Sequence, residues 1–252
     1  MSSYDASTAF GTEAQVQRDF LRQVFAWMFL ALALTTGVAI LFHNGSTAAW
    51  IYTHPTLFYV ALFAQLGFVF ALRFMLVSQR VSTQVAAFVF FLYAALTGAV
   101  FSVLLDAYTT DSVVGAFAGA CGVFAGMALI GYTTKTDLSR FGPILFGALI
   151  GIVAASFVFI FVGGQTLNLL IGYAGVVLFS ALTAYDMQML KKLRAGGAIS
   201  GRFGGFGRGG RTISFADGAS AEKLAIFGAL WLYLDFINLF ISLLRIFGGA
   251  RR

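Results

Sequence analysis

The chain has few charged residues, few prolines and a single cysteine. Lys, Arg, Asp and Glu together make up 10% of its 252 residues, against about a quarter in an average soluble domain. Because 60% of the residues are apolar, the composition excludes an ordinary soluble protein and leaves room for about seven membrane-spanning helices. Cys121 alone can form neither an internal disulfide nor a cysteine metal cluster.

Catalytic and export motifs are also missing. The chain contains no His-Glu-x-x-His zinc motif and no rhomboid-like Gly-x-Ser-x paired with a membrane histidine. We therefore expect no enzymatic activity and no resident cofactor. The polar N-terminus lacks the basic-then-apolar pattern of a cleaved signal peptide, so we expect the first span to be retained.

Seven apolar runs are long enough to cross a bilayer as helices. They cover residues 23–42, 56–77, 85–105, 112–132, 143–162, 167–190 and 224–247. None alternates as a barrel strand does. We predict an all-α integral membrane protein with one domain over residues 18–252, preceded by a disordered polar segment at residues 1–17. Within the domain, the Gly- and Arg-rich insertion at about residues 195–220 predicts a flexible linker in preference to an RNA-binding segment.

Lys and Arg occur in alternate loops. They lie before the first span and in the second-to-third, fourth-to-fifth and sixth-to-seventh connections, and are absent from the other three loops. This segregation predicts a cytoplasmic N-terminus, with anionic lipid rather than nucleic acid as the partner of the positive charge. Arg251 and Arg252 conflict with the pattern, because seven crossings place them outside. We expect a full last crossing in preference to a re-entrant helix.

Glycines follow one face of the fourth span and recur in the fifth. The spacing predicts close helix packing within the chain, with a homodimer face as the alternative. The residues are Gly115, Gly119, Gly122 and Gly126, then Gly147 and Gly151.

Four ionisable residues fall within the predicted spans: Arg73, Asp186, Asp235 and Arg245. A charged residue at the centre of a membrane helix costs roughly 2.5–3.5 kcal/mol, so each is a functional candidate. Asp235 lies near the middle of the last span, and Asn238, one turn on, faces the same way and can hydrogen-bond to it. Arg73 and Asp186 fall at similar depth and can pair. Arg245 is expected to extend to the outer interface.

Two aspartates in one site would hold a single proton over a range of pH, because their charges repel. Arg73 would then favour the charged form of Asp186 and compete with Asp235 for it, which makes a proton-dependent gate. The unprotonated pair offers oxygen ligands to calcium, but too few for tight binding, so it suits transit. Ion pairs that only fix helix packing are the alternative. The acids Asp106 and Asp111 and the histidines His43 and His54 are expected to be solvated loop residues.

Three segments resemble signatures of the transmembrane Bax inhibitor motif family. They are residues 132–139 (YTTKTDLS) with residues 145–151 (LFGALIG), residues 179–188 (FSALTAYDMQ), and residues 232–240 (LYLDFINLF) followed by Leu243-Leu244-Arg245. The similarity extends over about residues 17–248, in matching order and spacing. Phe-rich bacterial members are most similar, which implies a bacterial inner membrane.

The resemblance implies seven helices, with the last enclosed by the other six, and a pH-sensitive calcium leak governed by two aspartates. By motif, the pair corresponds to Asp186 and Asp235 and the arginine latch to Arg73, with Asn238 and Arg245 in support. Calcium would be the permeant ion. The alternative is a non-transporting regulator that binds another membrane protein, such as a membrane-bound protease. Proton-coupled calcium exchange would use the same residues. The Gly/Arg insertion departs from the short loop of close relatives.

Overall fold

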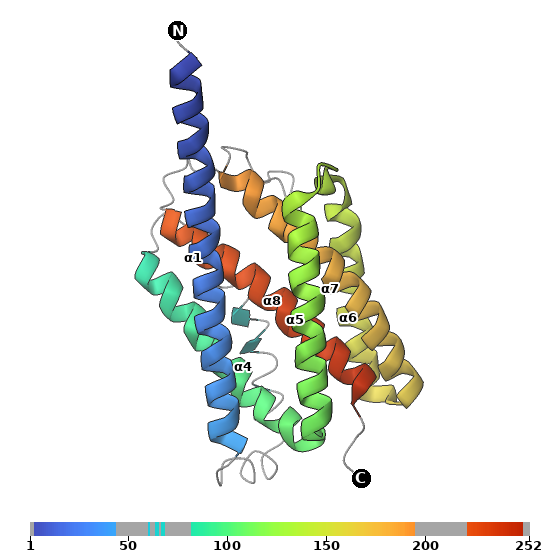
Figure 1. The fold of residues 1–252 in the computed structure, drawn as a ribbon. Coiled ribbons are helices and arrows are strands. Elements are labelled where there is room, and N and C mark those ends of the chain that lie inside the picture. The colour runs from blue at the N-terminus through green and yellow to red at the C-terminus, as the bar shows by residue number, and fades with distance from the viewer. Residues whose placement is uncertain are drawn as a thin grey trace.

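The computed structural model of the protein describes residues 3–43, 60, 64, 65, 67, 68, 82–194 and 221–248. Its elements are all helical (Figure 1). They are α1 (Ser3–His43), α4 (Thr83–Ala107), α5 (Thr110–Thr133), the short 3-10 helix η1 (Leu138–Phe141), α6 (Gly142–Val162), α7 (Gln165–Arg194) and α8 (Ala221–Phe247).

Six described helices are long and apolar enough to cross a membrane, and they match six of the seven predicted runs. The run at residues 56–77 lies mostly outside the described residues, so the seventh crossing stays a prediction. The insertion at residues 195–220 also lies largely outside them. We expected disorder at residues 1–17, but α1 begins at Ser3 and extends beyond the other helices (Figure 1). Extending an existing helix by one residue is easier than nucleating one, which favours this continuation.

Local signals explain where the helices turn. Ser82 and Thr109 stand in extended conformation before α4 and α5, and their hydroxyls accept backbone N–H bonds of Val85 and Ser112, both at 3.3 Å. These side chains satisfy donors that a helix start leaves open. After α6, Gly163 has φ of +65° and Gly164 of +96°, which glycine adopts without strain. The resulting tight turn makes α6 and α7 antiparallel neighbours.

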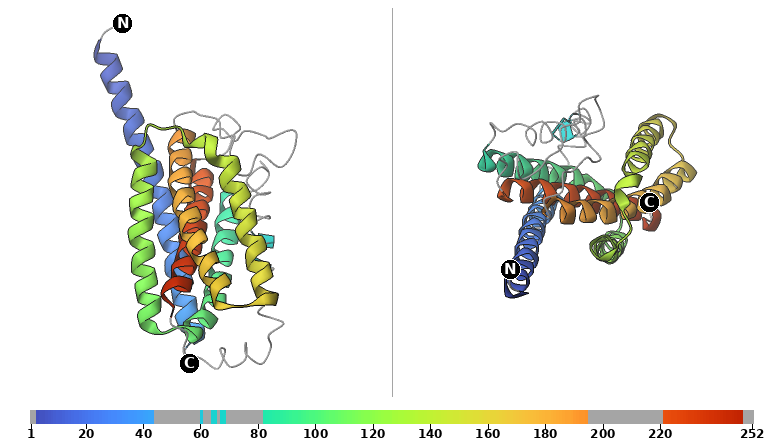
Figure 2. Two further views of the ribbon diagram at one scale, coloured as in Figure 1. Left: turned by 90° about the vertical axis from the view of Figure 1, so that its right-hand side faces the viewer. Right: turned by 90° about the horizontal axis from the view of Figure 1, so that it is seen from above.

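Helix α8 is the centre of the bundle (Figures 1 and 2). It packs against α1, α4, α5 and α7, whereas α6 packs on α7 and η1. In the most apolar stretch of α8, 78% of residues are buried, against none in α6. We expected the other six helices to enclose the last one. Four described helices pack against α8, α6 is peripheral, and the run at residues 56–77 lies mostly outside the described residues. Because α8 is continuous from Ala221 to Phe247, it is not a re-entrant hairpin.

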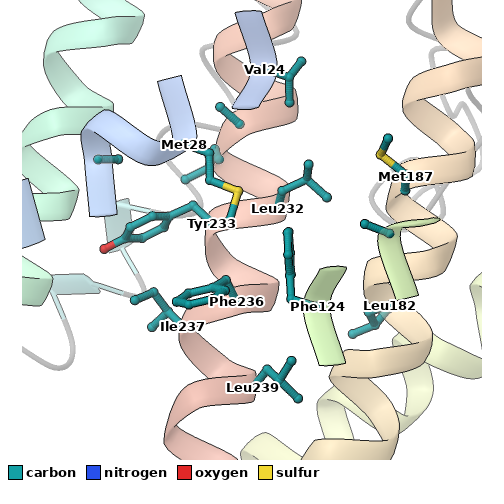
Figure 3. Close-up of a cluster of buried hydrophobic side chains, with 14 of the residues drawn as sticks. Val24, Met28, Phe124, Leu182, Met187, Leu232, Tyr233, Phe236, Ile237 and Leu239 are labelled. Carbon is teal, nitrogen blue, oxygen red and sulfur yellow. The ribbon is translucent and has the colours of Figure 1, made fainter. Parts of the chain in front are cut away.

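Aromatic side chains fill the space around α8 (Figure 3). The rings of Phe124 on α5 and Phe236 on α8 lie 5.6 Å apart in edge contact, and Phe90 on α4 meets Tyr233 at 5.7 Å. Met28 of α1 points to the same cluster. Since lipid tails are as apolar as these side chains, dense packing rather than transfer from water holds such helices together.

The prediction that the glycine face of α5 packs closely against another helix of the chain is wrong for the described residues. No described atom lies within 4 Å of a Cβ added at Gly115, Gly122 or Gly126, and Gly119 makes only ordinary contact. The buried face of α5 consists instead of Ala116, Ala120, Phe124, Ala128 and Gly131. Alanine permits close approach nearly as well as glycine, so the glycine spacing alone could not identify the contact face.

Candidate functional site

Close contacts fix the register between the antiparallel helices α7 and α8. A Cβ on Gly228 would lie 2.6 Å from Leu190 Cδ2, and one on Gly175 would overlap the Ser242 hydroxyl. Stepping along both helices from these contacts puts Asp186 level with Leu232. It also puts Asp235 about one turn, or roughly 5 Å, deeper than Asp186. From sequence, Asp235 is deeper than Asp186 if the last span starts at Leu224, and level with it if the start of that helix projects into the cytoplasm. The contacts between α7 and α8 support the deeper position.

Both aspartates face the α7–α8 interface. Asp186 follows the contact residue Gly175 by about three helical turns, and Asp235 precedes Ser242 by about two, so each shares the face of its contact residue. Asp186 is 3% exposed and Asp235 is 0% exposed. Each makes polar or charged interactions in the folded chain. The structure therefore buries the two predicted acids on facing surfaces of neighbouring helices.

The remaining predicted site residues either lie outside the described residues or make contacts that differ from those we expected. Arg73 lies outside the described residues, so its pairing stays a prediction. The Asn238 amide donates to the Leu234 carbonyl at 2.7 Å, back along its own helix. Arg245 is partly buried, with its guanidinium 5.8 Å from the ring centroid of Phe159 on α6. Arg245 thus contacts an aromatic ring of α6, whereas we expected it to extend to the outer interface.

A clamp that the sequence did not reveal holds the α5–α6 loop onto α7, two residues from Asp186. Gln188 Oε1 accepts the Leu138 N–H at 2.8 Å, and its Nε2 donates to the Thr136 carbonyl at 2.7 Å. The next turn adds Lys191, whose Nζ donates to the Tyr132 carbonyl in the last turn of α5 at 2.9 Å. One glutamine thereby satisfies two backbone groups of the loop and fixes it to the face of α7 opposite Asp186.

An ion pair between Lys192 and Asp137 completes the clamp. The hydrogen bond from Lys192, followed by those from Ser139, holds the pKa of the Asp137 carboxyl well below its usual range. Because both side chains are exposed, solvent screens the pair, and it adds little to stability. The loop residues belong to the family-like segment 132–139, but their partners are about 50 positions away and could not be read from the chain.

A buried hydroxyl cluster lies on the other side of α8. Tyr233 and Thr35 hydroxyls are 2.7 Å apart, and Thr35 donates to the Ala94 carbonyl at 2.9 Å. The Ala31 carbonyl is a second acceptor for Thr35 at 2.9 Å, and either hydroxyl can be the donor of the Thr35–Tyr233 bond. Gln65 donates to Thr97 beside them at 3.1 Å. Because Tyr233 is two residues from Asp235, it faces away from the acid, and the cluster ties α8 to α1 and α4.

The opposite end of the bundle has a close polar contact between a histidine and an aspartate where we expected solvated residues. His43 Nδ1 and Asp106 Oδ1 are 2.7 Å apart, joining the ends of α1 and α4. Both side chains remain partly exposed. Nothing in the local sequence signals this pair, since the two residues are separated by two loops and two predicted spans.

Calcium ligation by these residues would be sparse. Within the described ranges, no three His, Cys, Asp or Glu side chains come together as a metal-binding group. Calcium generally takes six to eight oxygen ligands. The carboxyl pair of Asp186 and Asp235 thus fits a passing ion better than a stored one.

The arrangement can now be compared with known proteins. The sequence model of the family described as "Inhibitor of apoptosis-promoting Bax1" matches residues 17–252. The chain belongs to this Bax inhibitor family. Inner membrane protein YbhL of Escherichia coli strain K12 is 41% identical over 233 residues, covering 92% of each chain. An uncharacterized protein of Deinococcus radiodurans is 42% identical over 234 residues, covering 93% of this chain and 91% of its own.

A more distant relative, an uncharacterized protein of Borreliella burgdorferi, is 35% identical over 240 residues, or 95% of each chain. Membership in the Bax inhibitor family confirms the resemblance read from the three sequence segments. The matches run through α7 and α8, so Asp186 and Asp235 lie inside the region that the family model covers.

Proposed function

We propose that this Bax inhibitor family protein is a pH-sensitive calcium leak channel of the bacterial inner membrane, with its N-terminus and basic loops in the cytoplasm. The observation that carries the proposal is the burial of Asp186 and Asp235 on facing surfaces of two membrane-spanning helices, one turn apart. Acids are costly in such a position and are usually retained for ion or proton handling. The name of its relative YbhL supports the inner membrane.

Protonation would act through the α7–α8 contact. When both carboxyl groups are charged, their repulsion is strong because little water separates them. A proton on either one removes that repulsion and changes the preferred spacing of the helices. Since the helices meet at Gly175 and Gly228 with no spare room, a change in spacing must be accommodated by movement of a whole helix. Calcium would pass by neutralising the same pair for a moment.

Arg73 would determine which of the two aspartates binds the proton. An arginine beside Asp186 favours its charged form and leaves the proton to Asp235. Losing that pairing would allow the proton to move between the acids. In this mechanism the pair titrates as one unit, so the response belongs to both residues.

Calcium flux into liposomes that contain the purified protein, measured across a pH series, tests the proposal. We expect a pH-dependent flux in the wild type and loss of that dependence in Asp235→Asn and Asp186→Asn. Asp111→Asn is the matched control, because Asp111 is an exposed acid at the start of α5. The mechanism is refuted when both site variants keep the wild-type pH dependence. Folded protein without flux above empty liposomes refutes the channel, and stoichiometric proton counter-movement indicates exchange.

A second candidate is a non-transporting regulator that binds another membrane protein, such as a membrane-bound protease. The specific observation is the open glycine face of α5, where Gly115, Gly122 and Gly126 leave room for a foreign helix. Gly122→Leu would then abolish co-purification with the purified protease and leave any calcium flux unchanged. Unaltered co-purification would exclude this face as the docking surface.

A further inference from the structure

A groove of about 750 Å³ runs between α6 and α7 on the outside of the bundle. Its lining is apolar, and small residues, among them Ala148, Gly151, Ala155 and Ala174, give it depth. Residues beside it, such as Val177 at 72% exposure, are open to the surroundings. Because both helices cross the hydrocarbon region by length and composition, the medium that meets this groove is lipid.

The dimensions of the groove suit a lipid chain. Its α7 side extends from Leu167 to Ala181, about 21 Å at the helical rise of 1.5 Å per residue. One leaflet contributes about half of the roughly 30 Å hydrocarbon core. The groove is thus long enough to take an acyl chain from the α6–α7 turn to the bilayer centre.

Arg245, a partly buried cation, lies beside Phe159, one turn of α6 beyond the residues that line the groove. Phe159 continues the α6 stripe of Ala148, Ile152 and Ala155, at helical spacings of four, three and four. The Arg245 guanidinium carbon lies 5.8 Å from the centroid of this Phe159 ring. Among the residues that the structure describes, buried Nη1 of Arg245 has no hydrogen-bond partner. A buried cationic donor without an acceptor is unfavourable, and an anionic oxygen would relieve it.

We propose that the groove binds an anionic phospholipid, with one acyl chain between α6 and α7 and its phosphate at the Arg245 guanidinium. An apolar helix from a second copy would fill the groove but would bring no acceptor to Nη1. A phosphodiester does both, because its oxygen atoms match the fork of guanidinium donors. This site lies on the lipid-facing side of α7, is separate from the aspartate pair, and stands whether or not the protein conducts calcium.

The chain offers a matched pair of variants for the test. Gly147 and Gly151 both lie on α6, and no described atom is within 4 Å of a Cβ at either position. Only Gly151 lines the groove. Gly151→Leu therefore fills the groove, whereas Gly147→Leu places the same side chain on α6 outside it. Arg245→Gln removes the charge, and Arg245→Lys restores it.

Native mass spectrometry of the full chain in detergent, titrated with phosphatidylglycerol or phosphatidylcholine, measures the binding. We expect wild type to hold one phosphatidylglycerol more tightly than phosphatidylcholine by about fivefold or more, the scale of one arginine at an anionic headgroup. Gly151→Leu should weaken binding of both lipids, and Gly147→Leu neither. Arg245→Gln should abolish the preference, and Arg245→Lys should recover part of it.

Several outcomes overturn the proposal. Equal binding of the two lipids by wild type, or an unchanged preference in Arg245→Gln, means that the guanidinium does not hold a phosphate. Equal binding by Gly151→Leu and wild type means that no chain occupies the groove. A dimer peak that Gly151→Leu alone removes assigns the groove to a second copy. Thermal unfolding of each variant in detergent separates these results from loss of fold.

Discussion

The contact between Gly131 and Ala184 offers a sharp test of how α5 and α7 are held beside the acid site. A Cβ on Gly131 would stand 2.8 Å from the Ala184 carbonyl carbon and closer to its oxygen. Ordinary contact begins at about 3.4 Å. Because the obstacle is backbone, no side chain can rotate out of the way, and the helices must separate. Overpacking of this kind costs roughly 1–3 kcal/mol.

Gly131→Ala should therefore destabilise the protein, although alanine is the better helix former by roughly 0.5–1 kcal/mol. Gly126→Ala on the same helix is the control, since no described atom opposes its Cβ. Because both variants gain the same helix propensity, we expect their free energies of unfolding to differ by the overpacking cost alone, roughly 1–3 kcal/mol in favour of Gly126→Ala. Reversible unfolding of the purified protein in mixed micelles measures the difference. Equal stability of the two variants would refute the close approach of α5 and α7 at this point.

Three further predictions concern hydrogen bonds and charge. Tyr233→Phe removes a buried hydroxyl bond and should lower the unfolding free energy in mixed micelles by about 0.6–1.7 kcal/mol, the range for bonds between membrane helices; unchanged stability would contradict it. Gln188→Ala frees the Leu138 amide, so hydrogen exchange there should quicken; an unaltered rate would show another acceptor. Lys192→Gln should raise the pKa of Asp137 toward its ordinary value, followed by carboxyl NMR. Since the wild-type pKa is depressed, the pair stabilises the clamp above the ordinary pKa and stops doing so as pH falls through the depressed one.

The membrane helices could be predicted from sequence because each is a long apolar run. The predicted spans at residues 85–105, 112–132 and 143–162 lie within α4, α5 and α6, extended by one or two residues at most ends. Hydropathy indicates which residues are removed from water, but it does not indicate which residues they contact. The amphiphilic start of α1 carries no such signal, so its helix from Ser3 went unpredicted.

The candidate acids were found because an aspartate inside a membrane span is costly and rare. The sequence left open whether Asp235 is deeper than Asp186 or level with it, because the relative depth depends on where α7 and α8 touch. That register is set by Gly175 and Gly228 against Ser242 and Leu190, and the numbers of these residues give no hint of their pairing. The same reason hid Gln188 and the His43–Asp106 pair, whose partners are distant in sequence.

The central place of α8 has a consequence for how the protein is made. A ribosome delivers the N-terminal part of a chain first, so α1, α4, α5 and α7 enter the membrane before the helix on which all four pack. Until α8 emerges, these four helices lack the helix on which they all pack. In the final step of assembly, α8 is therefore inserted between helices that are already in the membrane. Asp235 then enters its site after the helix that carries Asp186 is already in the membrane.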